Sequence, residues 1–144
     1  MGRGNLYRQS GQTASALRDF ERAIQLGSND ARVYFYRGII LQSQRNHVAA
    51  LEDFSTSIKL DRRAAPPLAR RGYSYLALND QTNAFNDFNS ALRLDKRNAE
   101  AWAGQALVLE QRGEKKRAFK SYSRALALDS TLSVARVGVS NTRG

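Results

Sequence analysis

Hydrophobic side chains recur along this chain at helical spacing, in short runs that polar segments separate. One run holds Val33, Tyr36 and Ile40, and the next holds Leu51, Phe54 and Ile58. Steps of three and four residues place such side chains on one face of an α-helix. Between the two runs lies the polar segment QRNH at 44–47. The pattern therefore predicts two amphipathic helices joined by a tight turn.

The same pattern returns at a fixed period along the whole chain. An Arg-Gly pair stands at 3–4, at 37–38 and at 71–72, so the interval from each pair to the next is the same. At this interval small, aromatic and leucine side chains align in columns: Gly4, Gly38, Gly72, Ala106; Ala16, Ala50, Ala84, Ala118; Phe20, Phe54, Phe88, Tyr122; Ala23, Ser57, Ala91, Ala125; Leu26, Leu60, Leu94, Leu128. A fixed period of this length indicates a solenoid, in which each repeat buries its apolar face against its neighbours.

Each repeat is expected to be one antiparallel helix pair. The repeats span about 1–30, 31–64, 65–98 and 99–132, and residues 133–144 form a partial capping helix of the same domain. Pro66 and Pro67 fall in the first turn of a helix, where the missing N–H costs little. Asn98 is placed to cap the helix that follows it. The fold class predicted is all-α: a solenoid of about nine helices.

These columns resemble the tetratricopeptide repeat family. The resemblance rests on a large residue near the start of three repeats (Tyr34, Leu68, Trp102), followed by a small residue, an alanine, an aromatic residue and a second small residue, and it covers residues 1–132. It implies a right-handed superhelix whose first helices line a concave groove. It also implies a scaffold for protein–protein interaction, because the family serves many different clients.

Each residue of the Arg-Gly pair is expected to have a structural role. Gly38 is expected to face Ala50 and Ser57, where a larger side chain would hold the helices apart. The arginines at 3, 37 and 71 are matched, at one constant spacing, by aspartates at 19, 53 and 87, whereas the fourth repeat has Gln105 and Ser121 at these two places. Because the arginine and the aspartate are lost together in the fourth repeat, we predict that in the other repeats they form an ion pair between the two helices. The alternative is that these arginines bind a ligand.

Composition limits the function classes. The chain has no cysteine, one histidine and no apolar run near the ~20 residues that cross a bilayer. His47 starts a helix, and no cluster has the spacing of a metal site or phosphate loop. We therefore expect no enzyme, no cofactor and no metal. The start of the chain lacks a secretory signal, which predicts a cytoplasmic or other intracellular protein, with nucleus and organelle left open. The simplest account of the chain's ends is a piece of a longer repeat protein.

Peptide capture is the first functional hypothesis. The resemblance places ten residues in the groove: Asn5, Arg8, Arg32, Phe35, Tyr36, Ile39, Arg70, Tyr73, Leu76 and Leu107. We expect an acidic peptide to bind near the arginines, with Glu100 and Glu110 at the other end of the groove. Some members of the family clamp the carboxyl terminus of heat-shock chaperones with five residues. Only Asn5 and Arg70 match that clamp, while Met1, Tyr36 and Pro66 depart from it, so we expect no chaperone clamp.

The net charge of +10 keeps a second hypothesis open. A basic helical-repeat module could bind RNA or another nucleic acid, with Tyr36 and Tyr73 stacking on bases. The densest basic run is EKKRAFK at 114–120. A solvated outer helix face is the favoured interpretation, and a nuclear-import signal or a phosphate contact is the alternative. A third possibility is a spacer in a longer array, without a ligand of its own.

Overall fold

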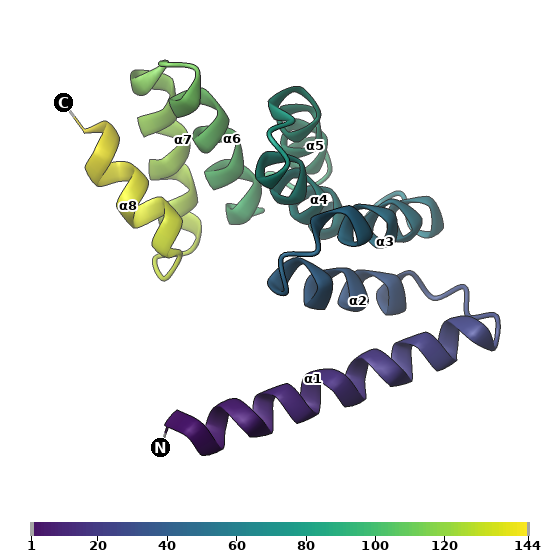
Figure 1. Cartoon of the computed structure of the whole chain (residues 1–144). Coiled ribbons are helices and arrows are strands. Elements are labelled where there is room, and N and C mark those ends of the chain that lie inside the picture. The colour runs from purple at the N-terminus through teal and green to yellow at the C-terminus, as the bar shows by residue number, and fades with distance from the viewer. Residues whose placement is uncertain (1, 144) are drawn as a thin grey trace. The chain divides into compact units, whose positions relative to one another are not determined.

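A computed structural model shows an all-helical chain (Figure 1). It describes the backbone of residues 2–143 and the side chains of residues 11–143. The helices in this part of the chain are α1 (Gly2–Gln25), α2 (Ala31–Ser43), α3 (His47–Leu60), α4 (Ala65–Ala77), α5 (Gln81–Leu94), α6 (Ala99–Gln111), α7 (Lys115–Leu128) and α8 (Ser133–Thr142). This confirms the all-α class, with eight helices in place of about nine.

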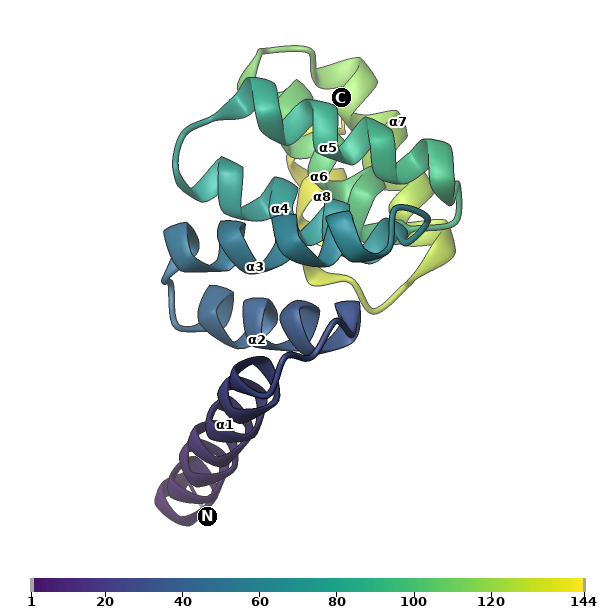
Figure 2. The same cartoon turned by 90° about the vertical axis from the view of Figure 1, so that its right-hand side faces the viewer.

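The chain divides into two compact units, Met1–Arg62 (unit 1) and Arg63–Gly144 (unit 2). Unit 1 contains α1, α2 and α3, and its closest packing joins α2 to α3. In unit 2, α4 pairs with α5 and α6 pairs with α7, while α5 packs on α6 (Figure 2). Helix α8 lies against α7 and α6. Three helix hairpins, α2–α3, α4–α5 and α6–α7, thus follow the repeat period, as predicted.

Local sequence signals set the helix ends. Asn98 caps α6 by accepting a hydrogen bond from the backbone N–H of Ala101, as predicted, and Asp80 caps α5 in the same way. Pro66 and Pro67 occupy the first turn of α4. The caps satisfy N–H groups that have no partner inside a helix.

The turns between paired helices explain why the structure has one helix fewer than predicted. Arg45, Asn79 and Gly113 each take a left-handed backbone conformation, with φ of 64°, 64° and 81°, and they occupy the same place in successive repeats. Such a residue ends the first helix of a pair and turns the chain back. Gly11 occupies that place in the first repeat, but it lies within the continuous helix α1. The turn that the repeat pattern predicts near Gly11 does not form, so repeat 1 is one long helix and not a pair.

The buried aromatic column forms the core of each hairpin. Phe54, Phe88 and Tyr122 have no exposed surface. A Cβ placed on Gly38 would lie 2.7 Å from Cε1 of Phe54, and one on Gly72 would lie 2.6 Å from Cε1 of Phe88. The expectation that Gly38 faces Ala50 and Ser57 is therefore corrected. Its nearest neighbour is the aromatic ring, because the helices approach closely enough for the ring to pack directly on the backbone.

Unit 2 adds a second glycine to this arrangement. Phe88 also meets Gly104 of the next hairpin, and Tyr122 meets Gly138 of α8, in contacts that leave no room for a Cβ. Phe88 thus lies between Gly72 on α4 and Gly104 on α6. Successive helix pairs of unit 2 are held together by rings that pack against bare backbone.

Candidate interaction surfaces

The arginines of the Arg-Gly pairs are tied to aspartates on the second helix of the same hairpin. Arg37 donates two hydrogen bonds to Asp53, at 2.6 and 2.7 Å, and Arg71 donates two to Asp87, both at 2.8 Å. The side chain of Asp53 is 5% exposed and that of Arg37 is 24% exposed. These hydrogen bonds raise the pKa of both arginines, and burial raises the pKa of Asp87. The ion-pair prediction is confirmed for repeats 2 and 3.

The fourth repeat keeps the link without the charges. Ser121 donates a hydrogen bond to Oε1 of Gln105 at 2.9 Å, and Gln105 donates one to Asn89 at 2.8 Å. The two helices are therefore joined at the same place by neutral groups. A buried neutral hydrogen bond avoids the cost of removing two charges from water.

In unit 1 the predicted groove residues lie on α2 beside a cluster of aromatic rings. Phe35 contacts Tyr36, with ring centroids 5.5 Å apart, and also the buried Phe54. Tyr36 is 49% exposed and stacks on Phe20 of α1 at 6.3 Å. Ile39 is half-buried. Phe20 was not among the predicted groove residues, because its column placed it in a hairpin core that repeat 1 does not form.

The charge of Arg32 is already balanced. Its guanidinium donates hydrogen bonds to both carboxylate oxygens of Asp30, at 3.1 and 2.9 Å, while the same carboxylate caps α2. The pKa of Asp30 is lowered by these hydrogen bonds. Arg32 therefore offers an incoming carboxylate less than a free arginine would. The remaining unit 1 candidates, Asn5 and Arg8, lie outside the described side chains.

In unit 2 four candidate residues come from α4 and α6. Arg70 pairs with Glu100 at 3.1 Å, and the hydroxyl of Tyr73 donates to the backbone carbonyl of Glu100 at 2.7 Å. Leu76 and Leu107 are half-buried, and Leu107 packs on the cluster around Tyr122. The structure thus brings Arg70, Tyr73 and Glu100 together.

This contact corrects the expected charge pattern. Arg70 and Glu100 were expected to attract and repel acids at separate ends of a groove. They form one ion pair, because the first helices of consecutive repeats lie side by side and bring distant positions of the sequence into contact. Tyr73 is also less available than expected. Its ring packs edge-on against Phe88 at 5.1 Å, and burial raises its pKa.

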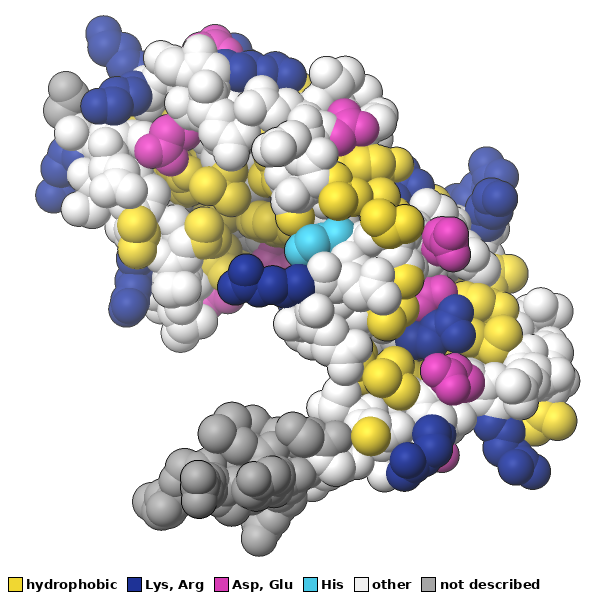
Figure 3. All heavy atoms as spheres, viewed as in Figure 1, with side chains coloured by type: hydrophobic (Ala, Val, Ile, Leu, Met, Phe, Trp, Pro, Cys, Tyr) yellow, Lys and Arg dark blue, Asp and Glu magenta, His cyan; other side chains and the backbone are white. Residues whose placement is uncertain are grey.

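The surface of unit 2 carries both hydrophobic and charged side chains (Figure 3). On the face of unit 2 in Figure 3, hydrophobic side chains gather in the middle and Lys and Arg side chains lie mostly at the edges. His47 begins α3 and is half-buried. Within the described residues, no group of His, Cys, Asp and Glu could hold a metal ion, and no helix is long and apolar enough to cross a membrane.

Helix hairpins repeated at a fixed period, with an aromatic ring packed on glycine, define a class of helical-repeat scaffolds. Two models of the tetratricopeptide repeat (TPR) match the chain, "TPR repeat" at residues 4–44 and "Tetratricopeptide repeat" at residues 69–133. Together these segments span well over half of it. The chain belongs to the tetratricopeptide repeat family, whose members act as scaffolds for protein–protein interaction.

Solved structures with the same fold include several TPR domains. The Arabidopsis OM64 TPR domain is 23% identical with a TM-score of 0.73, and the match covers 81% of this chain and 98% of that one. MamA is 18% identical with a TM-score of 0.79, over 99% of this chain and 83% of that one. The first TPR of Spaghetti (RPAP3), bound to the HSP90 peptide SRMEEVD, is 20% identical with a TM-score of 0.72. That match covers 80% of this chain and 91% of that one. Among curated protein sequences, none matches this chain. At these identities the similarity establishes the fold alone.

Proposed function

We propose that this chain binds a peptide segment of a partner protein on the faces of its first helices. The observation that supports this most directly is the aromatic cluster on α2. Tyr36 is a large aromatic side chain that is half-exposed, and it stacks on Phe20 beside Phe35. Exposed aromatic side chains of this kind anchor partners at interfaces, because they bury a large area with little loss of rotamer freedom.

The peptide expected here is anchored by an apolar side chain, with charge in a secondary role. Arg32 is paired with Asp30 and Arg70 with Glu100, so an acidic peptide would have to compete with carboxylates already in place. Such competition lowers the gain from each new ion pair. Acidic residues in the ligand therefore modulate the affinity and do not provide most of it.

A chaperone carboxyl terminus is not the expected ligand. The peptide SRMEEVD is bound by the RPAP3 domain whose fold is similar. In this chain Tyr36 and Pro66 stand at clamp positions, and Arg70 already holds Glu100. We expect no saturable binding of SRMEEVD by the full chain.

The test is a selection from a displayed random peptide library on the full chain. Enriched peptides should carry an aromatic or branched apolar residue at a constant position. Their affinity should fall by about tenfold or more on Tyr36→Ala, which corresponds to about 1.4 kcal/mol. The matched control is Leu26→Ala, which removes another exposed apolar side chain of unit 1 that is 78% exposed. If no peptide is enriched, or if both variants bind equally well, the proposal is wrong and a spacer role becomes the better account.

A second variant tests the part played by unit 2. Glu100→Gln removes the carboxylate that pairs with Arg70 and keeps the backbone carbonyl to which Tyr73 donates. An enriched peptide with an acidic residue that contacts unit 2 should then bind more tightly, because it no longer competes with the Glu100 carboxylate for Arg70. Weaker binding of such a peptide would show that Glu100 itself contacts the ligand.

A further inference from the structure

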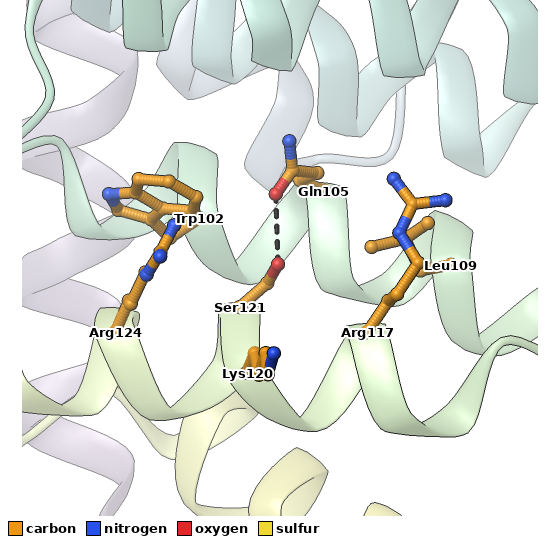
Figure 4. A pocket seen from close by; sticks show the side chains of 7 residues that line it. All are labelled: Trp102, Gln105, Leu109, Arg117, Lys120, Ser121 and Arg124. Atoms are coloured by element: carbon orange, nitrogen blue, oxygen red, sulfur yellow. Dashed lines mark hydrogen bonds between the residues drawn. The ribbon is translucent and has the colours of Figure 1, made fainter.

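A second surface of unit 2 forms a cleft outside the predicted groove. Two adjoining cavities, of about 380 and 500 Å³, share Trp102, Gln105 and Arg124. Side chains from α6 and α7 face each other across the first cavity (Figure 4). The second continues over α5, where Asn89 and Leu92 line it. The cleft therefore crosses three helices and is longer than a single pocket.

Basic side chains dominate its lining. The cations are Arg117, Lys120 and Arg124 from α7, Arg93 from α5, and Lys96 from the turn that follows. None of the residues that line either cavity is an aspartate or glutamate. Glu114 pairs with Arg117 at 2.8 Å from the adjacent turn, and Arg93 donates to Ser90 at 2.9 Å. Among the ion pairs of the described residues, four of the five cations have no carboxylate partner.

The repeat period shows that this charge distinguishes the fourth repeat from the third. One period earlier, the three α7 cations correspond to Asn83, Asn86 and Ser90 of α5, which are neutral. Repeat 1 carries Arg18 and Arg22 at two of the same places. At the floor of the cleft, Gln105 and Ser121 replace the arginine and aspartate of the earlier repeats, so that no carboxylate stands beside the α7 cations there.

Trp102 holds part of this lining in position. The guanidinium of Arg124 lies over the indole ring, 4.8 Å from its centroid, and the indole N–H donates to the backbone carbonyl of Lys96 at 2.8 Å. Stacking on the ring fixes the arginine while its N–H groups stay free to donate. The same contact covers one face of the only aromatic side chain in the cleft. Base stacking, on which binding of single-stranded nucleic acid relies, therefore has little surface here.

We propose that this cleft binds an acidic peptide segment of a protein partner, at a site separate from the first-helix faces. Arg117 and Arg124 lie two helical turns apart, so the row of cations on α7 extends for about 10 Å. An extended peptide covers that length with about three residues. Arginine and lysine on both walls can then pair with successive carboxylates. The open, elongated shape suits a chain better than a small anion, which needs a more enclosing pocket.

The test uses a short fluorescein-labelled polyglutamate peptide and the full chain, with binding read as fluorescence anisotropy. Lys120→Glu should weaken binding by about tenfold or more, because it reverses a charge inside the cleft. Lys116→Glu is the matched control: it makes the same change on the same exposed helix but does not line the cleft. It should weaken binding by less than about threefold, since solvent and salt screen a charge that makes no direct contact.

A second variant introduces into repeat 4 the arginine–aspartate ion pair of the earlier repeats. Gln105→Arg with Ser121→Asp reintroduces the ion pair of Arg71 and Asp87, which this fold accommodates in repeat 3. It leaves net charge unchanged and should change peptide binding by less than about threefold, because the added arginine and aspartate neutralise each other as they do in repeat 3. Tyr36→Ala should have no effect on this probe, which separates this site from the proposed α2 surface.

Three results would overturn the proposal. If Lys116→Glu weakens binding as much as Lys120→Glu, attraction is a diffuse effect of net charge. If polyuridine of equal charge binds more tightly than the peptide and depends on Lys120, the cleft is a nucleic-acid site. If the peptide does not bind at low salt, the cleft has no acidic ligand of this kind.

Discussion

Gly104→Ala is the substitution by which the packing of unit 2 can be tested most directly. A Cβ at this position would lie 2.7 Å from Cδ1 of Phe88 and closer still to Cε1 and Cζ. Carbon atoms in van der Waals contact are about 3.5–4.0 Å apart, so relief requires the ring or helix α6 to move by about 1 Å. The ring has little room to move, because it also packs closely on the backbone of Gly72.

The expected cost follows from two opposing terms. Overpacking of a core typically costs about 1–3 kcal/mol, and the close contact places this site near the upper end. Replacing glycine by alanine inside a helix recovers about 1 kcal/mol of helix propensity. We therefore expect the free energy of unfolding to fall by about 1–2 kcal/mol. The measurement is a urea titration followed by fluorescence of Trp102, the single tryptophan, which lies on the same helix.

Two other glycines serve as internal controls. Gly72→Ala should cost less than Gly104→Ala, because repeat 4 carries Ala106 at the same place in its sequence and still packs Tyr122. Gly11→Ala should stabilise α1, because nothing lies within 4 Å of the added methyl group. That effect is measured by helical circular dichroism.

The ranking can be refuted. A Gly104→Ala protein as stable as the wild type, with the same dependence on urea, would show that Phe88 is not confined between the two helices. Adding Phe88→Leu to Gly104→Ala gives a further check. The double variant should lose less stability than the sum of the two single variants, since the smaller side chain removes the clash.

Two further predictions concern the ion pairs and α8. Arg37→Gln and Asp53→Ser copy the neutral pair of repeat 4. Their effects on the free energy of unfolding should be non-additive in a denaturant titration, with a coupling energy of about 1 kcal/mol or more. A coupling energy of zero would show that the ion pair does not contribute to stability. Truncation after Asp129 removes α8 and exposes the ring of Tyr122 that packs on Gly138, so unit 2 should lose about 2 kcal/mol or more of stability. An unchanged Trp102 unfolding curve after truncation would show that α8 does not contribute to the core.

The features that recur in each repeat could be predicted from the amino-acid pattern. The helix pairs, the aromatic column and the ion pair of Arg37 and Asp53 could be predicted, because the same physical requirement appears in successive repeats and substitutions occur together where it is absent. The loss of both charges at Gln105 and Ser121 was such a signal. Helix caps such as Asn98 were also predictable, because they depend on residues close in sequence.

The tertiary structure decided the features that depend on neighbouring hairpins. The ion pair of Arg70 and Glu100, the ring of Phe88 between two glycines and the basic cleft around Trp102 each join helices of different repeats. No column predicts them, because the residues involved differ from one repeat to the next. The continuity of α1 was also not predictable from the columns. Gly11 is able to adopt either a turn or a helix, since glycine has no strong preference of its own, and its place in the repeat therefore did not decide between them.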